Sequence, residues 1–155
     1  MGITSMAIGE VADWAALRGA IVRFMTANAA ASPQDVRALI RPDVWSAMED
    51  VEAFTGSGLT EWDRLMKNIP ADNIAMSSNA LPAPVADATT ALLSTVAGGL
   101  APLFIGAWGA VDLIRDPFSD AASGGLRLTG LATVDVTVAR PSQLQILTGL
   151  GVALS

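Results

Sequence analysis

Three carboxylates recur at intervals of four residues in the second half of the chain, at Asp112, Asp116 and Asp120. Carboxylate oxygens are preferred ligands of hard cations such as Ca²⁺, so this spacing raises the question of a metal site. Calcium-binding loops, however, place their carboxylates at closer intervals and need a glycine at a fixed offset. We therefore predict that the chain holds no metal.

Nucleophilic, acid–base and redox chemistry have few residues available. The chain contains no cysteine, histidine or tyrosine, which removes thiolate nucleophiles, the commonest general base and most transition-metal sites. No Gly-x-Ser-x-Gly elbow is present to activate a serine. The glycines at Gly98, Gly99, Gly106 and Gly109 lack the spacing of a phosphate-binding loop and are expected to mark turns. The sequence predicts a protein that is not an enzyme and has no catalytic residues and no cofactor.

The composition points to contacts with other protein. The chain has 155 residues, enough for one domain or one domain with a small appendage. Hydrophobic residues make up 52% and charged residues only 15%, below the roughly 25% charged residues of a typical soluble domain. Much of the surface is therefore expected to face other chains. A net charge of -6 without any cluster of lysine and arginine argues against sequence-specific nucleic-acid binding.

Apolar periodicity predicts three helices in the first half of the chain. In the first, over residues 10–28, Trp14, Leu17 and Ile21 begin a stripe at spacings of three and four residues. Pro42 begins the second, over residues 42–51, because its fixed φ suits the first turn of a helix. A short third helix is predicted over residues 61–67. The inward-facing residues of the second helix should be Val44, Trp45, Met48 and Val51.

The clearest strand signal is the alternation of apolar and polar residues from Leu126 to Arg140. It predicts a strand with one buried face and a length of roughly 45 Å, at about 3.3 Å per residue. Residues 32–40 fit a helix start or a buried strand, and we favour a strand over 36–40. Further strands are expected over residues 73–79, 91–96, 103–107 and 110–114.

The uncharged run from Ala88 to Val111 leaves one alternative open. It is long enough to cross a bilayer, which takes about 20 apolar residues. The glycines and Pro102 inside it, and the lack of flanking basic clusters, favour short buried strands instead.

The tryptophans divide into two groups. Trp14 and Trp45 lie on helical stripes that need a core, so both are expected to be buried. Trp62 lies with Leu65 and Met66 beside a glycine-rich loop, and these three residues are predicted to contact another subunit.

Several segments, taken in order, resemble the major capsid proteins of tailed phages. The segment 104–118, FIGAWGAVDLIRDPF, is similar to the family's IGxWGGLDLLVDPY, and VDVTVARP at 134–141 is similar to its VDVxVRRP. Upstream, SSNALP at 77–82 resembles VSNxLP, and PDVW at 42–45 resembles the end of xxxWVMNPxxW. The similarity covers most of residues 10–141.

This resemblance implies an α+β chain with the Hong Kong 97-type fold, which encapsulin nanocompartments share. Residues 1–118 would form an axial domain, with a mixed sheet flanked by helices. Residues 119–155 would carry one long strand of a peripheral domain and a C-terminal tail. Asp112 and Asp116 match acids of the family, which implies turn capping or a pairing between subunits.

The function that the resemblance implies is structural. Copies of the chain would associate with one another and with other capsid subunits into pentamers or hexamers of an icosahedral shell. The chain would be found in the virion, and in the host cytoplasm during assembly, with no membrane partner. An encapsulin-like shell and, less favoured, a single-span membrane protein through Ala88 to Val111 are the alternatives.

The resemblance also implies a fragment or a truncated form. The family's N-terminal arm, extended loop and spine helix have no counterpart in the sequence, and the partners of the long strand would lie mostly in that missing half. Its edge is therefore expected to be unpaired, and an edge of this length invites pairing with another chain.

Overall fold

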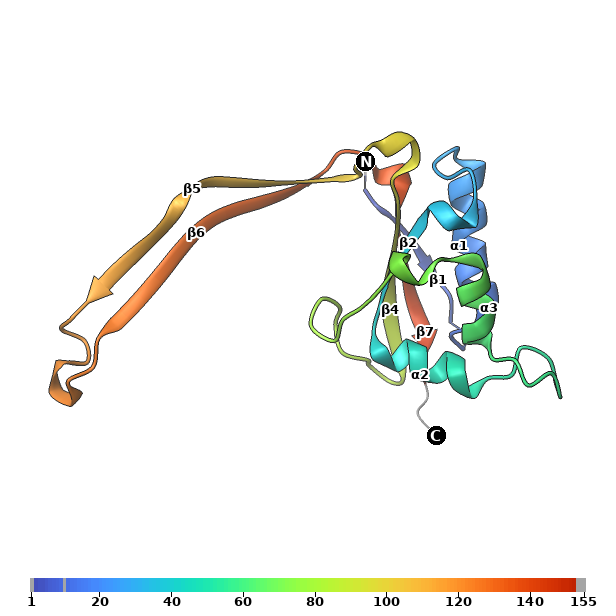
Figure 1. Ribbon diagram of the computed structural model, residues 1–155, viewed down its shortest axis with the longest axis horizontal. Coiled ribbons are helices and arrows are strands. Elements are labelled where there is room, and N and C mark those ends of the chain that lie inside the picture. Colours follow the sequence, from blue (N-terminus) through green and yellow to red (C-terminus); the bar gives the residue numbers. More distant parts are fainter. Residues whose placement is uncertain (1, 10, 153–155) are drawn as a thin grey trace. The chain divides into compact units, whose positions relative to one another are not determined.

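The computed structural model describes residues 2–9 and 11–152, which form seven strands and three helices joined by loops and short 3₁₀ turns (Figure 1). The helices are α1 (Trp14–Thr26), α2 (Pro42–Asp50) and α3 (Glu61–Asn68). The strands are β1 (Thr4–Ala7), β2 (Val36–Ile40), β3 (Ile74–Met76), β4 (Ala88–Thr95), β5 (Leu103–Asp116), β6 (Arg127–Val138) and β7 (Leu144–Gly151).

These elements divide into two compact units. The first runs to Pro102 and resumes at Arg140, and the second comprises Leu103–Ala139. The boundary expected at residue 118 instead falls inside the second unit, just after β5 ends at Asp116.

The first unit is built on a five-stranded mixed sheet in the order β1-β7-β4-β2-β3. The pairs β1–β7 and β2–β3 are parallel, whereas β4 is antiparallel to both β7 and β2. Strand β2 has the predicted bounds, but β1 and β7 were not predicted. The predicted C-terminal tail therefore contains a strand at the interior of the sheet.

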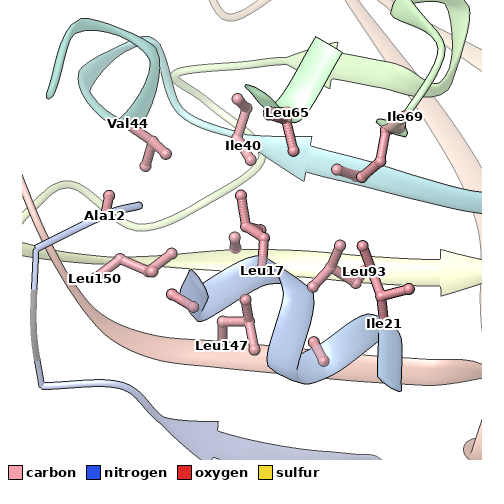
Figure 2. Close-up of a cluster of buried hydrophobic side chains, with 14 of the residues drawn as sticks. Ala12, Leu17, Ile21, Ile40, Val44, Leu65, Ile69, Leu93, Leu147 and Leu150 are labelled. Atoms are coloured by element: carbon pink, nitrogen blue, oxygen red, sulfur yellow. The ribbon is translucent and has the colours of Figure 1, made fainter. Parts of the chain in front are cut away.

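Helix α1 covers one face of this sheet. The Asp13 side chain begins the helix by accepting a hydrogen bond from the backbone N–H of Ala16 at 2.7 Å. Trp14, Leu17, Ile21 and Phe24 of its predicted apolar stripe are buried, whereas Met25, which was predicted on the same stripe, is 41% exposed. Figure 2 shows Leu17 and Ile21 of α1 in one cluster with Leu93 and Leu147 of the sheet.

Helices α2 and α3 complete the core around α1. Val44 and Met48 of α2 are fully buried, and so is Leu65 of α3. Trp45, however, is 41% exposed, so its predicted place in the core was wrong. Successive helical residues are about 100° apart, and α2 turns Val44 inward and the neighbouring Trp45 toward solvent.

A buried carboxylate joins α3 to α1. Thr60 and Asp63 form a capping box that begins α3, which places Glu61 in its first turn. Glu61 is 5% exposed, and its side chain accepts a hydrogen bond at 2.8 Å from the backbone N–H of Trp14. Its other oxygen pairs with Arg64 at 2.8 Å. One side chain thus satisfies a free donor of α1 and fixes α3 beside it.

The second unit is an antiparallel ribbon of β5 and β6, whose strands run side by side in Figure 1. We expected two strands before residue 115, but β5 is continuous, with an irregularity between Trp108 and Asp112. Gly109, at φ +78°, lies within this bulge and makes no turn between strands.

Two further expectations are revised by the structure. The long strand was expected to lack its partners, but β6 pairs with β5 along its length, and only its other edge has no strand beside it within the described residues. Ala88 to Val111, expected in the membrane alternative to span a bilayer as one helix, instead comprise β4, a short 3₁₀ turn and part of β5. None of the helices in the described residues is long and apolar enough to cross a membrane.

Candidate functional site

The register of β5 and β6 separates the ribbon into two chemically different faces. Residues directly opposite each other on paired strands share a face. Leu103 pairs with Val138 and Ile105 with Val136, so these four side chains lie together. We call their side of the ribbon the aliphatic face. It consists of Leu103, Ile105, Ala107, Val111, Leu113 and Arg115 from β5 and Leu128, Gly130, Ala132, Val134, Val136 and Val138 from β6.

The bulge keeps this face continuous. Residues 109–111 of β5 lie opposite Ala132 alone, so β5 has two extra residues there and the alternation resumes on the same side. Val111 confirms the assignment, because a Cβ built on Gly130 would lie 3.8 Å from its Cγ1. Arg115, near the far end, is the one charged residue of the aliphatic face.

The aliphatic face is exposed to solvent. Ile105 is 77% exposed, Leu113 68% and Val134 63%, and none of the described side chains of the second unit is buried. The sequence correctly indicated an apolar face on β6, but the expectation that this face is buried was wrong for the chain by itself. Contiguous apolar surface of this kind marks an interaction site in soluble proteins.

The opposite side, which we call the mixed face, carries aromatic and polar side chains. Phe104 pairs with Thr137 and Trp108 with Thr133. A Cβ at Gly106 would lie only 2.7 Å from Cη2 of Trp108, so the indole ring lies over the glycine. The mixed face therefore presents an aromatic group that needs a glycine beneath it.

Asp116 holds the turn at the far end of β5. Its carboxylate accepts hydrogen bonds from the Ser119 hydroxyl and from the backbone N–H groups of Phe118, at 2.8 Å, and Ser119, at 3.2 Å. These bonds, that of the Ser119 hydroxyl first, lower the pKa of Asp116 below its ordinary value of 3.8. Asp112 is exposed on the mixed face, opposite Leu131. No group of three metal-binding side chains occurs in the described part of the chain.

The three predicted contact residues of α3 lie in different environments. Leu65 is fully buried, so its side chain belongs to the core of its own chain. Trp62 is partly buried and packs against that core, and Met66 is half-buried. Trp62 and Met66 therefore retain surface that another subunit could contact.

The sequence-based candidates omit the aliphatic face of β5, although a signal for it was present. Leu103, Ile105 and Ala107 alternate with Phe104 and Gly106 much as β6 alternates. Because Gly109 was predicted to lie in a turn, the apolar alternation of β5 was not followed through to Val111 and Leu113.

No family model and no curated protein sequence matches this chain. Solved structures do match its fold. A virus-like particle from Pyrococcus furiosus superimposes with a TM-score of 0.59 at 14% identity, over 94% of this chain and 56% of the other. A Mycobacterium phage Che8 structure gives 0.59 at 14% identity, covering 94% and 53%. The capsid of a native GTA particle gives 0.59 at 17% identity, covering 96% and 50%.

These similarities establish the fold. The mixed α+β architecture predicted from the sequence is confirmed, and so is its resemblance, in fold, to Hong Kong 97-type capsid proteins. The chain spans about half the length of each of these structures.

Proposed function

We propose that this chain is a shell subunit of a phage or prophage capsid, with a structural role and no enzymatic one. The observation that carries the proposal is the aliphatic face, which extends along a ribbon and is exposed in the isolated chain. Its support is the fold, which the chain shares with proteins that build capsids and a virus-like particle. An encapsulin-like shell would have the same fold and is not better supported.

The mechanism is burial of apolar surface between copies. Apolar surface removed from water stabilises a complex by roughly 25 cal/mol per Å², so covering several hundred Å² gives on the order of 10 kcal/mol before the costs of association. The ribbon also has a free backbone edge on each strand, and free edges accept further strands. Contacts of this kind, repeated around a rotation axis, close into a ring.

The two units would form different parts of the shell. In our proposal the helix-covered sheet serves as the axial part and the ribbon as the peripheral part, so the boundary lies at Leu103 and Ala139 instead of residue 118. Copies would meet in pentamers or hexamers with other capsid subunits, first in the host cytoplasm and then in the virion. Trp62, Met66, Asp112 and Asp116 remain proposed subunit contacts.

Isosteric substitutions on the two faces of β6 test this proposal. Val134→Thr with Val136→Thr puts two hydroxyls on the aliphatic face without changing side-chain size. Burying each hydroxyl without a partner costs about 1 to 3 kcal/mol, so association should weaken about tenfold or more. The matched control is Thr133→Val with Thr137→Val on the mixed face, which should not weaken it.

Sedimentation velocity over a range of concentrations provides the readout. The wild-type chain should form oligomers whose population rises with concentration, and circular dichroism should show that both variants keep the wild-type fold. A wild-type chain that stays monomeric at every concentration would contradict the proposal. Equal association of wild type and the aliphatic-face variant would show that this face is not the contact.

A further inference from the structure

The first unit has a cavity of about 640 Å³ where the ends of β4 and β7 meet the end of α2. Six of its ten lining residues are glycine or alanine. Gly149, at φ +72°, would place a Cβ 3.3 Å from the backbone nitrogen of Gly9. The lining residues are Gly9, Val11, Ala47, Asp50, Val51, Ala86, Asp87, Ala88, Gly149 and Gly151.

The charges of this cavity are all negative. Asp50 is the last residue of α2, where the helix dipole adds partial negative charge, and Asp87 lies in the turn before β4. Both residues are exposed, and neither carboxylate has an ion pair or hydrogen bond within the described residues. An apolar cavity with two unpaired carboxylates is complementary to a surface that is apolar and basic.

The outer face of α1 is such a surface. Arg18, Val22 and Met25 follow one another at spacings of four and three residues and form one exposed row, and Arg23, also exposed, lies at the opposite margin of the helix's exposed surface. Within the described chain neither arginine is in an ion pair. Val22 and the flexible Met25 can fill a shallow apolar site, while the arginine stems cover its rim.

We propose that the outer face of α1 in one copy docks into the Asp50–Asp87 cavity of a second copy. The proposal rests on the proposed function, because it names the surfaces through which first units would meet. The two surfaces are complementary in charge, belong to the same unit and share no residue. Each copy therefore offers one surface of each kind, which is the condition for a head-to-tail ring.

Charge exchange between the two surfaces tests the docking. Arg18→Glu with Arg23→Glu makes the helix face acidic, and Asp50→Lys with Asp87→Asn makes the cavity rim basic. The second pair suits the fold, since a lysine is favourable at a helix C-terminus and asparagine tolerates the φ of +57° at position 87. Arg37→Glu is the matched control, because β2 directs Arg37 to the sheet face away from the buried residues of the core.

Each pair alone should weaken association about tenfold or more, because like charges then face each other across the contact. The chain with all four substitutions should associate again, and so should an equimolar mixture of the two variants, in which unlike copies alternate. Arg37→Glu should associate as the wild type does. The readout is sedimentation velocity, with the thermal unfolding midpoint of each variant as the check on folding.

The outcomes separate this proposal from the one it rests on. If the wild type associates but both charge variants associate equally well, the docking is wrong and shell assembly stands. Failure of the four-substitution chain to recover, with its fold intact, would also overturn the docking. A wild-type chain that never associates would overturn both proposals.

Discussion

The carboxylate of Glu61 accepts a hydrogen bond at 2.8 Å from the backbone N–H of Trp14, a residue 47 positions earlier in the chain. The first N–H groups of a helix have no partner within it, so this contact satisfies a donor of α1 that would otherwise be buried and unpaired. Glu61 also pairs with Arg64, whose guanidinium lies 5.0 Å from the centre of the Phe54 ring. Glu61 thus joins α1 to α3, and Arg64 extends the contact to the exposed loop before α3.

Glu61→Ala should lower the free energy of unfolding by about 3 kcal/mol. The substitution leaves the buried N–H of Trp14 without an acceptor, which is costly, and the partly exposed Arg64 without its partner. Urea unfolding followed by circular dichroism measures the change. Glu49→Ala, at an exposed position of α2, is the control and should change stability by less than about 0.5 kcal/mol. A comparable effect of both substitutions would show that the hydrogen bond contributes nothing specific.

Ala86→Asn with Asp87→Gly should raise the free energy of unfolding by about 1 kcal/mol. Val85 and Ala88 exchange backbone hydrogen bonds of 2.9 and 3.1 Å around a two-residue turn. Ala86 and Asp87 have φ of +49° and +57°, a conformation that costs an alanine about 1 to 2 kcal/mol and that Asn-Gly adopts readily. Thermal unfolding measures the gain. The control Ala83→Asn, at a position where φ is not positive, should not raise the thermal stability.

Asp116 should titrate below its ordinary pKa of 3.8, because hydrogen bonds from Ser119 and Phe118 favour the charged carboxylate. A lowered pKa in the folded state stabilises the turn above the pKa of the unfolded chain. That contribution is lost as the pH falls below about 3.8 through the folded value. Carboxyl chemical shifts followed by NMR give the titration, and Ser119→Ala should move the pKa of Asp116 back up. An unchanged titration in that variant would exclude the hydroxyl as the main cause.

Trp14→Ala and Trp62→Ala should affect different properties. Trp14 is 7% exposed, and its truncation should cost about 3 to 5 kcal/mol of folding free energy. Trp62 is only partly buried, so its truncation should cost folding less and weaken association more. Trp45→Ala, on the exposed side of α2, is the matched control for loss of an indole. Urea unfolding and sedimentation velocity together separate the two effects, and equal losses in both variants would contradict the division.

Local patterns predicted most elements of the first unit. Strand β2 was predicted with its bounds because Val36, Ala38, Leu39 and Ile40 are apolar and Pro42 follows them. Helix α1 was predicted because Trp14, Leu17 and Ile21 repeat at helical spacing. The resemblance in segments 104–118 and 134–141 led to the correct fold although no single motif there is specific.

The other features depend on contacts between distant parts of the chain or with other chains, which local sequence patterns do not reveal. Strand β1 spans only Thr4–Ala7 and exists because β7 pairs with it. Strand β7 mixes buried Gln145 with leucines and glycines, so its alternation is blurred. Whether the apolar face of β6 is covered depends on other chains, which its own sequence does not contain.

The two first-unit residues that flank the ribbon in the sequence are close together, because the backbone N–H of Arg140 donates to the carbonyl of Pro102 at 3.3 Å. This geometry has a consequence for folding kinetics. Strands β4 and β7 pair with each other although the whole ribbon lies between them in the sequence. Closing a flexible loop costs entropy, and each doubling of the loop length adds about 0.6 kcal/mol to that cost. Once β5 and β6 have formed a hairpin, the loop that remains to be closed between β4 and β7 is short. Formation of the ribbon during folding would thus bring β7 close to β4 and favour their pairing in the sheet.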